Sequence, residues 1–183
     1  YIKANPSRHF SLRWLGERFA GFIQQHLHGE QTSALVELAQ LEWCFTLAFD
    51  AADAEPLSLE QVASLTADEW PALQLQWLPS VQSLPLAYNS LALWQAAKAG
   101  AEFPSSELLQ EPKLCLIWRQ QLVSHYRSLD SAEAAALQGM CVSGWNFAQL
   151  CEELVEYGEQ APVKAAGWLK QWLSEELLQR RAD

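Results

Sequence analysis

Two strand-like runs between residues 113 and 129 constrain the fold of this chain more than any other segment. The run from Lys113 to Arg119 is apolar on both faces, whereas polar and apolar side chains alternate from Leu122 to Leu129. Gln120 and Gln121 leave room only for a tight turn between the runs. The pattern predicts an antiparallel hairpin whose first strand is covered on both faces and whose second strand is a half-exposed edge.

Two capped helices are predicted after this hairpin. Asp130 with Glu133, and Asn146 with Gln149, have the spacing at which a side chain accepts from the first free N–H groups of a helix. A strand-strand-helix-turn-helix order is typical of recognition modules, and in nucleic-acid-binding winged helices the second helix is the reader. Residues 128–163 contain acidic side chains but no Lys or Arg, so this helix would repel a phosphate backbone.

The periodicity of the chain changes at Pro71. Before it, residues 11–27 and about 33–49 show the helical spacing of apolar side chains. After it, apolar and polar side chains alternate from Leu73 to Trp77, and the segment from Val81 to Tyr88 is a second extended run. A helical part is therefore expected to precede a part that contains strands.

The sequence predicts an α+β fold in two regions. Residues 1–70 form a helical layer, expected to be the end of a longer N-terminal helical domain. Residues 71–183 form a recognition domain in which a small antiparallel sheet packs against helices, as in a winged helix or a peptide-recognition element. Within it we expect a short helix from Ser90 to Lys98, an irregular connection over residues 100–112, and a last helix from Pro162 to about Gln179.

Composition narrows the classes of partner. The chain has 12 basic and 22 acidic residues, a formal net charge of −10, which argues against non-specific binding to nucleic acid or to an anionic membrane. Protein and peptide partners stay open. The sequence shows no signal peptide and no apolar run of membrane-spanning length. Its 4 cysteines lack CxxC spacing and lie in apolar patterns, which predicts reduced core thiols and a cytoplasmic protein.

Motifs of catalysis and metal binding are missing from the sequence. His26 and His28 point to different sides of a helix, and no further ligands accompany them for a zinc site. Cys141 could act as a nucleophile only with a base such as His125, and a packed thiol in an Ala-rich helix is the favoured interpretation. Phosphate-binding, zinc-protease and serine-hydrolase motifs are absent. The sequence predicts no catalytic residue, no metal ligand and no bound cofactor in this chain.

The sequence contains 9 tryptophans, a high number for 183 residues. Most of them fall on periodic apolar faces, so core packing explains them. Trp70 and Trp145 lie at boundaries between predicted elements, where an exposed indole could anchor a partner and a packed indole would fix a hinge. Both are therefore candidate residues of a partner interface.

An ordered series of short motifs runs through nearly the whole chain. They are Asn5-Pro-Ser7, Ser11-Leu-Arg-Trp-Leu-Gly16, Phe19, Leu38-Ala-Gln-Leu-Glu-Trp43, Phe49-Asp-Ala51, Trp70-Pro71, Leu78-Pro-Ser80, Leu93-Trp94, Ile117-Trp-Arg119 and Tyr126-Arg-Ser-Leu-Asp130. In this series the chain resembles the HvfC/BufC-type family, bacterial proteins whose N-terminal region was labelled a DNA-binding domain. One departure is Asn5, where the family commonly has His before Pro-Ser.

The resemblance implies a role as a partner subunit. Members of this family resemble the partners of multinuclear non-heme iron oxidases of the barrel type, which modify cysteines in ribosomally made peptides. The implied function is to hold a precursor peptide and dock it on the oxidase, with the iron in the oxidase and no catalysis in this chain. The alternative is a transcriptional regulator whose DNA-binding region lies mostly upstream of this chain.

The predicted peptide site combines the second strand of the hairpin with the helix that follows Gly144. Peptide-recognition modules of such pathways take a leader peptide as an added strand beside a helix. The predicted strand residues are Leu122, Val123, Ser124, His125, Tyr126 and Arg127. The predicted helical wall carries Glu152, Glu153 and Glu156, where basic residues of a leader could pair. Val123→Pro, which removes a donor from the strand, is expected to weaken binding more than Glu153→Ala.

Overall fold

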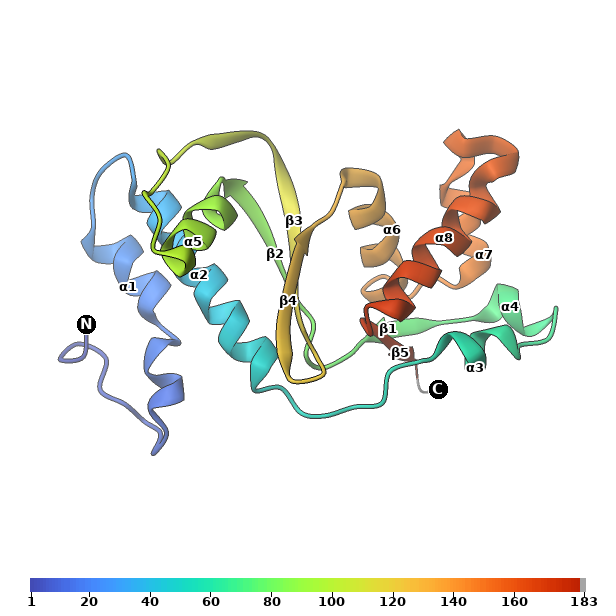
Figure 1. Cartoon of the computed structure of the whole chain (residues 1–183), viewed down its shortest axis with the longest axis horizontal. Helices are drawn as coiled ribbons and strands as arrows, with labels where there is room; N and C mark the ends of the chain where they lie inside the picture. Colours follow the sequence, from blue (N-terminus) through green and yellow to red (C-terminus); the bar gives the residue numbers. More distant parts are fainter. Residues whose placement is uncertain (182–183) are drawn as a thin grey trace.

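The computed structural model describes residues 1–181 and confirms the predicted α+β fold. The helices are η1 (Leu12–Gly16), α1 (Phe19–His26), α2 (Thr32–Phe49), α3 (Leu59–Ala63), α4 (Glu69–Ala72), α5 (Ser90–Ala99), α6 (Ser131–Cys141), α7 (Phe147–Glu153), η2 (Val155–Gln160) and α8 (Ala161–Ser174). The strands are β1 (Leu75–Trp77), β2 (Gln82–Tyr88), β3 (Leu108–Gln120), β4 (Val123–Ser128) and β5 (Leu178–Arg180). In Figure 1 the long hairpin stands in the middle, with α1, α2 and α5 on one side and α6 to α8 on the other.

Strands β2, β3 and β4 form an antiparallel sheet in that order, so β3 is central and β4 is an edge, as predicted. The tight turn lies at Gln121 and Leu122, one residue later than expected, and both have positive φ (49° and 64°), as in a type I′ hairpin turn. The irregular connection predicted over residues 100–112 is wrong at its end. Strand β3 begins at Leu108, whose partner is Tyr88 across a bulge.

Strand β3 separates two hydrophobic cores. Because its side chains alternate, Cys115 and Ile117 enter a core built with α2 and α5, whereas Leu116 and Trp118 enter a larger core built with α6, α7 and α8. Leu116, Ile117 and Cys115 are fully buried. The apolar character of both faces in the sequence is therefore explained by two separate layers of helices.

The predicted helix caps are present. The Asp130 side chain accepts from the Glu133 N–H at the start of α6, and Asn146 and Gln149 form a full capping box on α7. The segment predicted as one helix over residues 11–27 is divided into the 3₁₀ turn η1 and the helix α1.

The prediction of a last helix to about Gln179 is wrong in its final turn. Helix α8 ends at Ser174, Glu176 has a φ of 53°, and the chain continues as β5. The two-stranded pairing of β5 with β1 joins Leu75 to Arg180 and Trp77 to Leu178. Local helical periodicity could not anticipate a strand partner about a hundred residues away.

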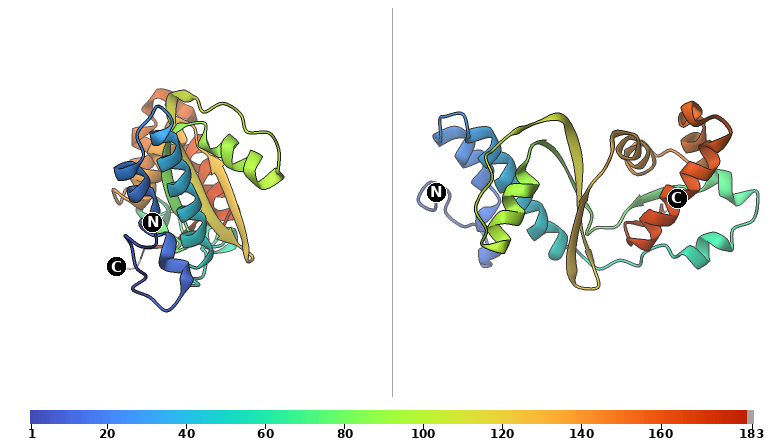
Figure 2. Two further views of the ribbon diagram at one scale, coloured as in Figure 1. Left: turned by 90° about the vertical axis from the view of Figure 1, so that its left-hand side faces the viewer. Right: turned by 45° about the horizontal axis from the view of Figure 1, so that its top comes forward.

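Residues 1–70 contain helices and connections, and α2 lies against the sheet formed by β2, β3 and β4. Both views of Figure 2 show the same long helix beside the hairpin. A boundary at residue 70 stays a prediction. Among the helices of residues 1–181, none has both the length and the apolar character needed to cross a membrane.

Candidate functional site

Strand β4 has two backbone edges: one is hydrogen-bonded to β3, and the other is free. The N–H of Leu129 donates to the carbonyl of Leu114 at 2.8 Å. Hydrogen-bonded pairs recur at every second residue of an antiparallel ladder. The two-residue turn, which is closed by a hydrogen-bonded pair, predicts the same set of paired residues. Arg127, His125 and Val123 therefore point their N–H and C=O groups at β3. The backbone groups of Ser124, Tyr126 and Ser128 point outward from the edge of the sheet.

The opposite edge of the sheet, on β2, is closed to another strand. Leu114 uses its backbone groups toward β4, so its β2 partner Pro85 faces outward, where proline has no N–H to offer. The next outward N–H, of Ala87, donates to the Glu37 carboxylate at 2.6 Å. Within residues 1–181, no hydrogen bond reaches the N–H of Ser124 or Tyr126 on the β4 side. Of the two outer strands of this sheet, β4 is therefore the one with an open edge.

A hollow of about 740 Å³ adjoins this open edge. Its walls come from α2, α5 and β4, and its residues are Glu42, Phe45, Trp94, Gln95, Lys98, Ala99, Ser124 and Tyr126. Side chains that extend from a strand added beside Ser124 and Tyr126 would alternate between this hollow and the other face of the sheet. The hollow and the free edge therefore form one composite site.

Three aromatic rings form the base of the hollow. Phe45 stacks on Trp94 with ring centroids 4.2 Å apart, and Tyr126 meets both rings edge-on at 5.6 and 5.2 Å. Gln95 donates to the Tyr126 hydroxyl at 3.2 Å, and the Lys98 ammonium lies 4.9 Å from the centre of the Trp94 ring. The geometry suits an apolar side chain with a polar or charged neighbour.

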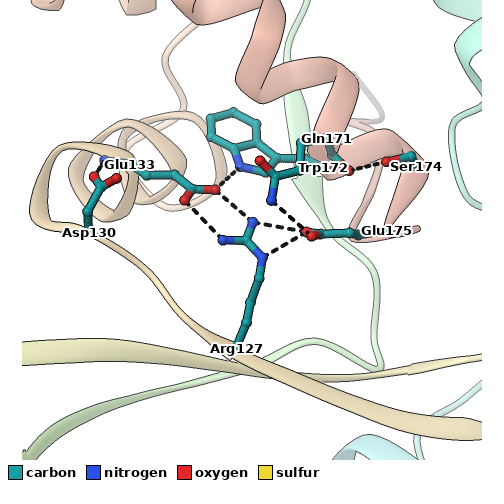
Figure 3. Close-up of polar contacts among 7 residues, drawn as sticks. All are labelled: Arg127, Asp130, Glu133, Gln171, Trp172, Ser174 and Glu175. Carbon is teal, nitrogen blue, oxygen red and sulfur yellow. Dashed lines mark hydrogen bonds and ion pairs between the residues drawn. The ribbon is translucent and has the colours of Figure 1, made fainter.

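Arg127 directs its side chain away from this hollow, into an ion-pair network between β4, α6 and α8 (Figure 3). Its guanidinium donates to both carboxylate oxygens of Glu133 and to Glu175. Burial opposes the charge of Arg127, but hydrogen bonds and charges from Glu133 and Glu175 outweigh it and raise its pKa. The predicted site residue Arg127 therefore holds the edge strand in place, and its side chain is occupied.

The remaining predicted strand residues are placed as follows. His125 stacks on Trp118 at 5.6 Å, on the face opposite the aromatic hollow, and Leu122 belongs to the turn. Val123 lies on β4, but its N–H faces β3 and closes the hairpin with Gln120. Val123→Pro would therefore disrupt the hairpin itself. Ser124 is the position at which proline removes an outward donor.

The predicted helical wall at Glu152, Glu153 and Glu156 does not face β4. Helix α7 contacts α4, α6 and α8, and Figures 1 and 2 place it at the end of the molecule away from the hairpin. The buried side chain of Leu150 packs α7 against the larger core. The expectation that α7 forms the other wall is wrong; α2 and α5 provide it.

Trp70 and Trp145 are packed against the larger core. Trp70 meets Phe147 edge-on at 5.3 Å. The Trp145 ring lies over Gly139 so closely that a Cβ at residue 139 would be 2.0 Å from it. These contacts support the hinge-packing interpretation of both indoles.

Other candidates for chemistry are explained by packing. Burial raises the pKa of Cys141 to about 12, so its thiolate is scarce at neutral pH. His26 stacks on Phe22 at 4.1 Å, and its Nδ1 lies 3.0 Å from the Phe22 carbonyl. In the part of the chain that the structure describes, no three His, Cys, Asp or Glu side chains gather as a metal site would need.

Sequence reasoning missed Phe45 and Trp94, because their helical spacing is equally typical of core residues. Lys98, an exposed basic residue in the last turn of α5, was missed as well. It also missed Glu37, a polar residue inside an apolar helix. Pro85 could have indicated the open edge from the sequence alone. A proline in an extended run is typical of an edge strand, so the strand at the opposite edge of the sheet becomes the candidate for binding.

Comparison of the chain with protein-family models gives no match, and comparison with curated proteins gives none.

Proposed function

We propose that this chain is a non-catalytic, cytoplasmic subunit that binds a ribosomally made precursor peptide and docks it on a multinuclear non-heme iron oxidase. The peptide joins the sheet as a strand beside β4. The observation that best supports this proposal is the open β4 edge next to an aromatic hollow. The other edge of the same sheet, on β2, is closed by Pro85 and Glu37. The ordered motifs that resemble the HvfC/BufC-type family support the choice of this oxidase as the partner.

Main-chain hydrogen bonds and apolar contact would give most of the affinity. Each net hydrogen bond contributes about 0.5–1.5 kcal/mol, and burial of a large apolar side chain adds about 1.5–3 kcal/mol. The half-buried rings of Phe45 and Tyr126 offer that apolar surface, and the buried Trp94 packs against both of them. Charge at the rim, from Glu42 and Lys98, would contribute less because both side chains are exposed.

Iron and oxygen chemistry belong to the partner in this proposal. Burial raises the pKa of Cys44 to about 11 and of Cys115 to about 12, which keeps both thiols protonated near neutral pH. These thiols are core residues, so they support a binding role better than a nucleophilic one.

Co-purification tests the proposal. The affinity-tagged chain is expressed in its native organism, bound proteins and peptides are identified by mass spectrometry, and bound iron is measured by elemental analysis. An iron-containing enzyme of the barrel type together with a small precursor peptide is the expected result. Retention of a specific DNA sequence without either would favour the transcriptional regulator instead.

A matched pair of proline variants then tests the site. Ser124 and Ser83 lie on β4 and β2, and both point their N–H outward from the same sheet. We expect Ser124→Pro to weaken peptide binding at least about tenfold by calorimetry, and Ser83→Pro to leave it unchanged. Circular dichroism checks that both variants fold. If the wild type and both folded variants bound the peptide with equal affinity, the peptide would have to bind at another site.

A further inference from the structure

A second hollow, of about 620 Å³, lies between α1 and α2. Its residues are Arg13, Gly16, Phe19, Ile23, Leu27, Leu35, Leu38, Ala39, Glu42, Trp43 and Thr46, and we call it the α1–α2 groove. Phe19, Leu27 and Leu35 remain 43%, 45% and 39% exposed. Large apolar side chains that line one continuous groove at such exposure mark an interaction surface.

The walls of the groove determine what kind of segment can fill it. Phe19 and Ile23 lie one turn apart on α1, and Leu27 follows at its C-terminal end. Leu35, Leu38 and Ala39 share one stripe on α2. Backbone groups inside a helix are already paired, so these walls offer no ladder to an extended peptide. A ligand must therefore satisfy its own backbone while it presents an apolar stripe. An amphipathic helix does both.

The charges that line the groove determine which charge the polar side of that helix should carry. Arg13 is neutralised by Asp50, whose carboxylate lies 2.9 Å from its Nε. Glu42 lines the groove with an exposed carboxylate, and no ion pair holds it within residues 1–181. With the net charge of −10, the groove attracts a cationic neighbour.

We propose that the α1–α2 groove docks an amphipathic helix of a protein partner, one that carries Lys or Arg beside its apolar stripe. The groove and the β4 hollow share helix α2, where Glu42 borders both, but the other wall of the groove is α1, whereas the β4 hollow is completed by α5 and β4. The docking surface therefore holds whether or not a peptide joins the sheet. The basic stripe also distinguishes this partner from a second copy of the chain, which is itself strongly acidic.

Three isoleucines, Ile2, Ile23 and Ile117, provide a direct readout by ¹³C-methyl NMR. Ile23 lines the groove, and Ile117 is buried on β3 next to its register partner Tyr126 on β4. Occupation of the groove shifts the Ile23 signal. Strand addition at β4 instead shifts Ile117, so failure of this proposal and failure of the peptide site are distinguishable. Ile23→Val assigns the signal.

The probe is a synthetic stapled helix of 14 residues with a Leu stripe flanked by Lys. Two further peptides have Glu in place of Lys, or the same composition with the Leu positions scrambled. We expect the Lys helix to shift Ile23 and to bind about tenfold more tightly than the scrambled helix. Leu35→Ser should weaken it by a similar factor, whereas Val163→Ser, at an exposed position on α8, should not. Glu42→Lys should reverse the preference between the Lys and Glu helices.

Equal binding of the stripe and scrambled peptides, or a shift of Ile117 without Ile23, would overturn the proposal. Sedimentation gives an independent check. A dimer of the free chain that Leu35→Ser dissociates would show that a second copy fills the groove, and would also overturn it.

Discussion

Arg127 and Glu133 form a two-point ion pair in which Nη1 lies 3.0 Å from Oε2 and Nη2 lies 2.7 Å from Oε1. The Glu133 side chain is only 7% exposed, and it also accepts from the Trp172 indole N–H at 2.8 Å. A carboxylate so placed depends on the guanidinium for its charge balance. The pair thus ties the edge strand β4 to helices of the larger core.

Removal of the cation should destabilise the fold strongly. Arg127→Met leaves Glu133 buried without a charged partner, and we expect the free energy of unfolding to fall by about 3–5 kcal/mol in urea titrations. The more exposed pair of Arg13 with Asp50, whose side chains are 30% and 34% exposed, is the matched control. Asp50→Asn should change the free energy by about 0–1 kcal/mol. Similar losses in both variants would contradict the distinction between buried and exposed pairs.

Glu37 should be essential for the junction between β2 and α5. Its carboxylate accepts from the N–H groups of Ala87 and Tyr88 and from the Ser90 hydroxyl, at 2.6, 3.1 and 2.6 Å. Glu37→Gln places an amide donor among these donors, and we expect a loss of about 2–3 kcal/mol in the free energy of unfolding. Hydrogen exchange at Ala87 should accelerate. The control is Glu42→Gln, an exposed change on the same helix, which should stay within about 0.5 kcal/mol.

Gly139 and Gly167 both lie in helices, and their replacement by alanine should have opposite effects. A Cβ at Gly139 would meet the Trp145 ring at 2.0 Å, so Gly139→Ala should lower the free energy of unfolding by about 1–3 kcal/mol. At Gly167 no atom lies within 4 Å of the added Cβ, and Gly167→Ala should raise it by about 0.4–1 kcal/mol. Thermal unfolding of the two variants measures the sign of each effect.

The buried thiols should make stability fall at alkaline pH. Burial raises the pKa of Cys115 and of Cys141 to about 12, whereas a thiol in the unfolded chain has a pKa of about 8.5. Above that pH the unfolded chain releases protons that the folded chain keeps. The stabilisation is therefore complete below about pH 8.5 and is lost as pH rises toward 12.

The size of this effect should be about 1–2 kcal/mol for each thiol at pH 10. Urea titrations of the wild type and of a Cys115→Ala, Cys141→Ala double variant, at pH 7.5 and pH 10, measure it. The variant removes both thiols, so its free energy of unfolding should depend less on pH. Identical pH dependence in the two proteins would contradict the assignment.

Local patterns in the sequence predicted the elements whose causes are local. The turn after β3, the cap at Asp130 and the capping box at Asn146 each depend on a few neighbouring residues. Strand β5 and the first part of β3 depend on distant partners, Leu75 with Arg180 and Tyr88 with Leu108. Periodicity within a short window contains no information about such pairing.

The candidate site also has one part that local sequence patterns predicted and one part that they did not. Alternation along residues 122–127 indicated a half-exposed edge, and the structure has that edge at β4. The wall beside it depends on how α2 and α5 approach Tyr126, which is a matter of tertiary packing. Charge composition also favoured the acidic α7, but an exposed acidic face on a helix carries no information about which strand lies nearby.

Leu116 and Ile117 are neighbours in the chain, yet their side chains belong to different cores on opposite sides of β3. Neither core can open without removing a wall of the other, so the two should melt together. A calorimetric scan should give one peak whose enthalpy equals the van't Hoff value, even though the molecule has two hydrophobic centres.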